Sequence, residues 1–364
     1  HQADLPQPEG DAALAGAYDA MNDSAHAVVY DQRVWLNYPT SAEAQGAEAE
    51  LRKHRQEMGS DYPEPSAQAL LARAGKLLDA RQYDPARREL TAISQRFTGA
   101  ARELALVRIG DAMRRNRKDA SSLDYLASLQ LSSPEADAER LYQTVAAARR
   151  FNRLDVMEGA VDRLTRRYPN SEWRQQALVA AGNEYLLRND VAQYEPLYRA
   201  CFAAFPRIGQ AAYCHWKVAF RAYLENRKEA ADLLREQVRD YPESEAASAA
   251  MYYLGRMAER AGAHSDARAW YDHLQRSFPN YYYGILARDR REQPAIAHAS
   301  ASPAVAAFLR PIRFPGKPLP ASFDPPPAAR ARIDRSRLLR AAALDELAEL
   351  ELRFAAKSSD PKLR

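Results

Sequence analysis

The sequence has few of the residues that mark several protein classes. Only 14 glycines occur in 364 residues, and valine and isoleucine are sparse, which disfavours a β-sheet protein. Two cysteines cannot build a disulfide-dense scaffold or supply the four ligands of a structural zinc site. No run approaches the roughly 20 apolar residues that cross a bilayer. The sequence therefore predicts a soluble chain without a transmembrane segment.

Alanine, leucine, arginine and glutamate dominate the composition. They favour helix throughout, and 46% hydrophobic residues are enough for a sizeable core. The 52 basic and 48 acidic residues give a net charge of +4 without a clustered basic stripe, so we expect no nucleic-acid partner. The chain begins at His1 without methionine, and we expect a mature or trimmed product.

Junctions that end in proline recur along the chain at regular intervals. Four of these prolines are spaced 37, 36 and 37 residues apart, namely Pro169, Pro206, Pro242 and Pro279. Phe97-Thr98 and Ser133-Pro134 divide the interval from Pro63 to Pro169 into 35, 36 and 35 residues. A period of about 36 residues is typical of tetratricopeptide-like helical hairpins. The sequence thus predicts an all-α superhelical solenoid with six hairpins and a closing helix over 63–292.

Each repeat contains local signals for two helices. A small residue recurs where they would cross closely, at Gly75, Gly110, Ala146, Gly182, Ala219 and Gly255. Proline disfavours helix in the residue before it, so each second helix should end at the junction. Polar residues after the junction, such as Ser171 and Ser244, are expected to cap the next helix. Asp84 and Pro85 predict a helix start with Asp84 as the N-cap.

The segments outside the repeats have a different residue pattern. Residues 1–62 are predicted to form an atypical N-terminal helical cap, with one helix over 41–58 and a frayed stretch over 1–11. Prolines crowd residues 293–330, which predicts an extended connector with a short helix over 303–309. Helical periodicity resumes in the linker region 331–364.

No group of residues predicts catalysis, cofactor binding or metal binding. Glu243-Ser244 lies in a repeat junction, where it is interpreted as a helix cap. No phosphate-binding loop or nucleophile motif occurs. The histidines show no metal-ligand spacing and are scattered, at His1, His26, His54, His215, His264, His273 and His298. We therefore expect no catalytic, cofactor or metal residues.

Two pairs of features leave alternatives open. Cys201 and Cys214 lie at similar distances from a turn and should face each other in a helical hairpin, either as buried thiols or as a disulfide. In the segment 281–285, Tyr282 and Ile285 are predicted to be core positions of a closing helix. A platform on which a sugar stacks is the alternative for these tyrosines.

Two phrases at the end of the repeats resemble a known family. SFPNYYYGILAR occupies 277–288, and LLRAAALDELAELEL occupies 338–352 after the proline-rich connector. This order resembles the superhelical, non-catalytic region of soluble lytic murein transglycosylases, over roughly residues 60–352. Ala343 replaces the usual glycine of the second phrase, so we expect a straighter helix there.

The resemblance implies a periplasmic scaffold, with outer-membrane association as one option, for an enzyme that cleaves peptidoglycan glycan strands. In the family a catalytic domain with Glu-Ser and Gly-Leu-Met-Gln motifs follows, and neither motif occurs over 352–364. We expect a fragment that is inactive by itself. The alternative hypothesis is a non-enzymatic envelope adaptor that binds other proteins, and a cytosolic repeat scaffold is a third.

Overall fold

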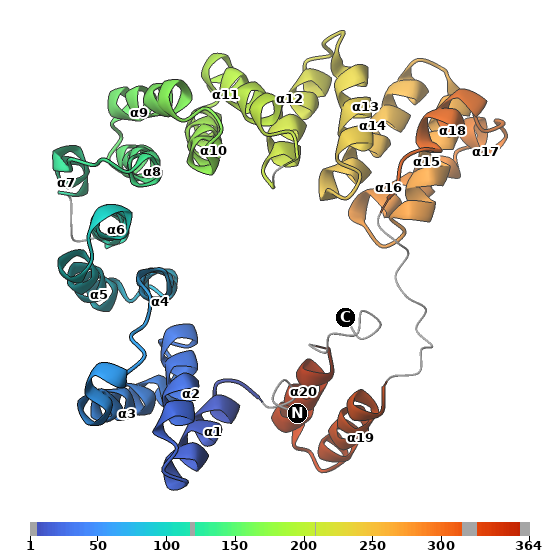
Figure 1. Ribbon diagram of the computed structural model, residues 1–364. Helices are drawn as coiled ribbons and strands as arrows, with labels where there is room; N and C mark the ends of the chain where they lie inside the picture. Colours follow the sequence, from blue (N-terminus) through green and yellow to red (C-terminus); the bar gives the residue numbers. More distant parts are fainter. Residues whose placement is uncertain (1–5, 117–120, 208, 315–325, 357–364) are drawn as a thin grey trace. The chain divides into compact units, whose positions relative to one another are not determined.

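The computed structural model describes residues 6–116, 121–207, 209–314 and 326–356, which contain helices and no strand (Figure 1). The chain divides into two compact units, His1–Asn226 and Arg227–Arg364. None of the described helices is long and apolar enough to span a bilayer. The prediction of an all-α protein built from tetratricopeptide-like hairpins is confirmed.

The first unit begins with a group of three helices and a short 3₁₀ turn and continues as helical hairpins. Its elements are α1 Glu9–Ala20, α2 Ser24–Asn37, α3 Ala42–Met58, η2 Gly59–Asp61, α4 Ala67–Asp79, α5 Tyr83–Arg96, α6 Gly99–Arg115, α7 Ser122–Ser128, α8 Pro134–Arg150, α9 Leu154–Arg167, α10 Glu172–Leu187, α11 Val191–Ala204 and α12 Ala211–Leu224. Helices α4, α6, α8 and α10 contact one another in succession, and α5, α9 and α11 lie on the outer side of this row (Figure 1).

The second unit contains the last hairpin and the elements after it. They are α13 Ala230–Asp240, α14 Glu245–Arg260, α15 His264–Ser277, α16 Tyr282–Arg291, α17 Pro294–Ala297, α18 Pro303–Leu309, α19 Pro327–Ala341 and α20 Asp345–Ala356. The boundary between the units falls inside one predicted repeat, between α12 and α13. The second helix of another predicted repeat, α7, has only 7 residues.

The segments flanking the repeats differ from the prediction in three places. Helix α1 starts at Glu9, inside the stretch predicted to fray. The short helix over 303–309 is present, but Ile296 and Leu309 are also buried, so part of the predicted connector packs as α17 and α18 against α15. Helix α19 starts at Pro327, before residue 331, because proline fits the first turn of a helix. Residues 315–325 and 357–364 lie outside the described part.

In five of the hairpins that the structure describes, the turn contains a residue with positive φ. Asn152, Asn189, Asn226 and Gly262 have φ of 57°, 56°, 53° and 70°. Asparagine and glycine tolerate this left-handed conformation best, and it ends the first helix of a hairpin. Arg81 does the same at φ 61°, so α5 starts at Tyr83 with Gln82 as the N-cap residue. The prediction of Asp84 as N-cap is therefore wrong, since the helix has already begun there.

Three of the predicted small residues mark close helix crossings. An ideal Cβ at each would lie 2.4 to 2.6 Å from a side chain 16 residues later, in the pairs Gly110 with Leu126, Gly182 with Tyr198 and Gly255 with Tyr271. At Gly75 nothing lies within 4 Å. The residue 16 positions later there is Thr91, whose short side chain donates to its own helix at Arg87 O, 2.8 Å away. The first hairpin therefore does not use the contact that its sequence predicts.

Candidate functional site

The tyrosine-rich segment turns a different face to the core than the sequence predicted. Tyr282 and Ile285 are 68% and 45% exposed, whereas Gly284 and Ala287 are buried. Tyr283 packs against the rings of Tyr252 and Tyr253 on α14, at centroid distances of 5.4 and 5.7 Å. The prediction of Tyr282 and Ile285 as core positions is wrong.

Gly284 accounts for this rotation of α16. A Cβ at this position would lie 2.1 Å from the backbone oxygen of Phe278, at the end of α15. Only glycine lets the first turn of α16 approach that carbonyl so closely. The helix is thus fixed with Gly284 and Ala287 facing inward, and Tyr282 points away from the core.

A charged cluster fastens α16 to the last hairpin. Tyr271 OH donates to Glu259 Oε1 at 2.9 Å, and Arg290 Nε donates to the same oxygen at 3.0 Å. Burial by itself would raise the pKa of Glu259, but the bonds from Arg290 and Tyr271 outweigh it and lower the pKa below its ordinary value. Glu259 therefore stays ionised and joins α14, α15 and α16.

Helices α19 and α20 form an antiparallel hairpin that reverses at Ala343. The chain turns there with φ of 59°, and Leu344 N donates to Leu339 O at 2.9 Å. The expectation of a straighter helix is wrong, because alanine here adopts the conformation that glycine favours. The row of exposed side chains Leu344, Leu347 and Leu350, each 47 to 49% exposed, follows on one face. We call these three leucines the α20 apolar row.

Replacing Ala343 by glycine should stabilise the α19–α20 hairpin. A left-handed conformation costs a residue with a Cβ about 1 kcal/mol more than glycine, and greater freedom of glycine in the unfolded chain offsets part of the gain. We expect the free energy of unfolding to rise by about 0.5 kcal/mol in chemical denaturation. Ala341→Gly, which lies in the last turn of α19, is the matched control and should lower it. A decrease for Ala343→Gly would contradict the reversal at this residue.

The two cysteines face each other across the α11–α12 hairpin, as predicted. Their Sγ atoms lie 2.7 Å apart, and both residues are fully buried free thiols. The hydrogen bond that Cys214 donates lowers the pKa of Cys201 against the effect of burial, and the same bond raises the pKa of Cys214. The structure thus places the pair in contact as thiols.

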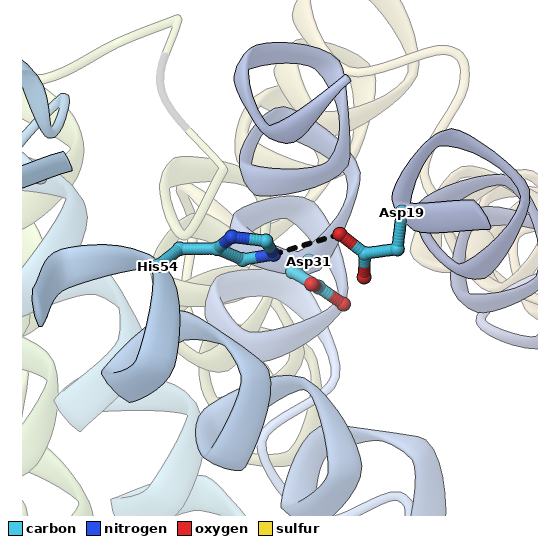
Figure 2. Close-up of side chains that lie close together, drawn as sticks. All are labelled: Asp19, Asp31 and His54. Carbon is cyan, nitrogen blue, oxygen red and sulfur yellow. Dashed lines mark ion pairs between the residues drawn. The ribbon is translucent and has the colours of Figure 1, made fainter. Parts of the chain in front are cut away.

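Three polar side chains meet between the N-terminal helices α1, α2 and α3. Asp19 comes from α1, Asp31 from α2 and His54 from α3, and one donor atom of each lies within 4.8 Å of the others (Figure 2). His54 Nε2 is 3.0 Å from Asp19 Oδ1 but lacks the alignment of a hydrogen bond. Asp31 and His54 are only 5% and 2% exposed. We call these residues the Asp-Asp-His cluster.

The electrostatics of the Asp-Asp-His cluster are unfavourable for a carboxylate. Burial, the largest cause, and the nearby Asp19 raise the pKa of Asp31 to about 6, although His54 acts in the opposite direction. Asp31 Oδ2 is buried without a hydrogen-bond partner. Sequence reasoning missed the cluster because its members are separated by 12 and 23 residues on three helices, a spacing that matches no ligand motif.

A groove also opens beside the first helices of the repeats. Its volume is about 450 Å³, and it lies between α8, α10 and the residues before α12. Polar and aromatic side chains that line it include Tyr142, Gln176 and Asn183. Tyr142 also stacks on Trp173 at a centroid distance of 5.2 Å. Ser244 of the Glu-Ser pair is the N-cap residue of α14, but its side chain makes no capping bond. Its hydroxyl donates instead to Tyr241 O at 2.8 Å, so the prediction that the Ser244 side chain caps this helix is wrong.

The sequence matches no protein-family model and no curated protein. Among solved structures, the chain is similar to a Rap protein complexed with competence and sporulation factor, at 14% identity over 90% of this chain and 96% of that chain, with a TM-score of 0.34. It is also similar to a monomeric IFIT1 mutant with Gppp-AAAA, at 12% identity over 95% and 89%, with a TM-score of 0.33. At such scores neither likeness bears on function.

Proposed function

We propose that this chain is a non-catalytic helical-repeat scaffold that holds another protein domain through the α20 apolar row. The observation that carries this proposal is the exposure of Leu347 and Leu350 on α20 and of Leu344 immediately before it. Large aliphatic side chains in a row on an exposed helix are the usual contacts through which a partner protein binds that helix. Charged residues of α20 lie beside the row, among them Asp345, Glu349 and Arg353, as expected for the rim of an interface. Leu352 and Phe354 of the same helix are also exposed, at 36% and 38%.

The occupant that we propose is the catalytic domain of a periplasmic peptidoglycan lytic transglycosylase. Two features support the resemblance on which this rests. Gly284 of the first phrase is required by its contact with Phe278 O, and Ala343 has positive φ where the family phrase has glycine. In such an enzyme one glutamate of the catalytic domain acts as acid and then base. The scaffold would position that domain on glycan strands.

A protein-binding adaptor without an enzymatic parent is the second candidate. It is favoured by the groove of about 450 Å³ between α8, α10 and the start of α12, because repeat solenoids bind partners along the faces of their helices. The reading frame beyond Arg364 separates the two candidates. A further domain of about 150 residues with Glu-Ser and Gly-Leu-Met-Gln phrases supports the transglycosylase, and a stop codon supports the adaptor.

The purified chain should release no 1,6-anhydromuropeptides from peptidoglycan sacculi, since its sequence lacks the Gly-Leu-Met-Gln phrase that accompanies the catalytic glutamate of the family. Chromatography of the soluble products measures this, and release by the chain alone would overturn the scaffold proposal. If the reading frame encodes such a domain, that domain, expressed separately, should bind the chain in a pull-down. Leu347→Asp should weaken this binding at least about tenfold, as loss of an interface anchor does.

Leu338→Asp is the matched control for Leu347→Asp. Leu338 is 72% exposed but lies on α19, outside the α20 apolar row. Its substitution adds the same charge to the same hairpin and should leave binding unchanged. Equal losses for both variants would mean that the row is not the contact surface.

A further inference from the structure

We propose that Asp19, Asp31 and His54 bind a zinc ion that ties together α1, α2 and α3. This inference does not depend on what covers α20, because the Asp-Asp-His cluster lies in the first unit. Each ligand comes from a different helix, and α2 packs against both α1 and α3. A bound ion would therefore act as a clamp on the N-terminal helices.

The donor atoms are already close enough for a shared ion. Zinc binds imidazole nitrogen and carboxylate oxygen at about 2.0 to 2.2 Å in tetrahedral geometry, so two of its donors lie about 3.4 Å apart. The three donors of the cluster are within 4.8 Å of one another, and small rotations of the side chains would bring them to bonding distance. Asp19 is partly exposed, at 26% of its side chain, which leaves room for water as a fourth ligand.

Unpartnered buried atoms supply the independent evidence for a ligand. Asp31 Oδ2 and both ring nitrogens of His54 are buried without a hydrogen-bond partner. Such atoms are costly in a folded protein unless something satisfies them. Figure 2 shows the His54 ring pointing toward both carboxylates. A cation at their centre would satisfy the nitrogen and the oxygen together and neutralise the two acidic groups.

The chemistry of the donors favours zinc over magnesium. Imidazole is a good ligand for zinc, whereas magnesium prefers oxygen donors and keeps several waters, which this buried cluster has little room to hold. The other nitrogen of His54, Nδ1, lies 3.9 Å from Glu57 Oε2. This distance is too long for a hydrogen bond, but Glu57 is the nearby carboxylate that could turn to accept from Nδ1 and orient a metal-bound histidine from outside the coordination sphere. Two carboxylates and one imidazole thus form a ligand set suited to zinc.

Zinc binding can be measured on the whole chain after treatment with a chelator. We expect one tightly bound zinc ion per chain by elemental analysis, and a melting temperature that rises with the logarithm of zinc concentration. Magnesium at the same concentrations should cause no shift. Asp31→Asn and His54→Gln should each weaken zinc binding at least about 100-fold. No zinc uptake by the wild-type chain, or unchanged affinity in both variants, would overturn the proposal.

Two further variants separate this cluster from other zinc ligands of the chain. His26→Gln removes an exposed histidine that lies 2.7 Å from Asp23 in the same helices, and it should leave zinc affinity unchanged. Cys201→Ser with Cys214→Ser removes the thiol pair and should also leave it unchanged. X-ray absorption of the zinc-loaded wild type identifies the zinc ligands without depending on whether any variant folds. Nitrogen and oxygen ligands alone are expected there, and sulfur in the coordination sphere would overturn the assignment.

Discussion

Gly284→Ala should lower the free energy of unfolding of the second unit by about 3 kcal/mol, at the upper end of the usual cost of overpacking. The added methyl group would lie 2.1 Å from Phe278 O, and a backbone carbonyl cannot turn aside as a flexible side chain can. The first turn of α16 would have to move, which strains the bonds from Arg290 to Glu259. Calorimetry of the wild type and the variant measures the loss.

Gly75→Ala is the matched control for this substitution. It is also a glycine-to-alanine change within a helix, but nothing lies within 4 Å of the position that the new methyl group would take. Alanine is a better helix former than glycine by up to about 1 kcal/mol, so this variant should be more stable than the wild type. A similar loss of stability in both variants would show that the contact with Phe278 O is not the cause.

Asp31→Asn should stabilise the metal-free protein at neutral pH by up to about 3 kcal/mol. The pKa of Asp31 is raised from 3.8 to about 6, and each unit of pKa corresponds to about 1.4 kcal/mol. Below the unfolded pKa of 3.8 the carboxyl group is protonated in both states, so it costs nothing. Between pH 3.8 and about 6 the unfolded state has lost its proton while the buried carboxyl group of the folded state keeps it, so stability falls across this range and is fully lost above about 6. The amide of asparagine carries no such penalty.

Denaturation curves of the chelator-treated proteins at pH 4 and pH 7 test this sign. The gain from Asp31→Asn should be small at pH 4 and large at pH 7. Asp23→Asn is the control, because hydrogen bonds from His26 lower the pKa of Asp23. The ionised Asp23 carboxylate therefore stabilises the folded state, and Asp23→Asn should lower the stability more at pH 7 than at pH 4. A gain for Asp31→Asn that is equal at both pH values would contradict the raised pKa. Saturating zinc should reverse the order of wild type and Asp31→Asn.

The repeats could be predicted from the sequence because their signals are local. At most junctions a proline ends one helix wherever the chain is placed in space, and the spacing of Pro169, Pro206 and Pro242 therefore sets the period directly. The pairing of Cys201 with Cys214 could also be predicted, since a short turn leaves an antiparallel hairpin only one register. The fold class and the positions of the repeat junctions needed no more than this.

The candidate sites depend on contacts that the sequence does not encode locally. The rotation of α16 is set by the approach of Gly284 to a carbonyl on another helix, and the tyrosines beside it gave the opposite prediction. The reversal at Ala343 was missed because alanine is a strong helix former. The Asp-Asp-His cluster joins residues on three helices, and each of them alone resembles an ordinary polar residue.

The left-handed turns at Asn152, Asn189 and Asn226 recur every 37 residues. The segment between two such turns is therefore a natural unit for gene duplication or deletion. A gene segment of that length, duplicated or deleted in frame, would add or remove one complete hairpin with both of its ends already formed. Because neighbouring hairpins meet through the same kind of surface, the new junction would match the old ones. The number of repeats can therefore change in evolution in whole steps, while the N-terminal helices and the α19–α20 hairpin keep their own structures.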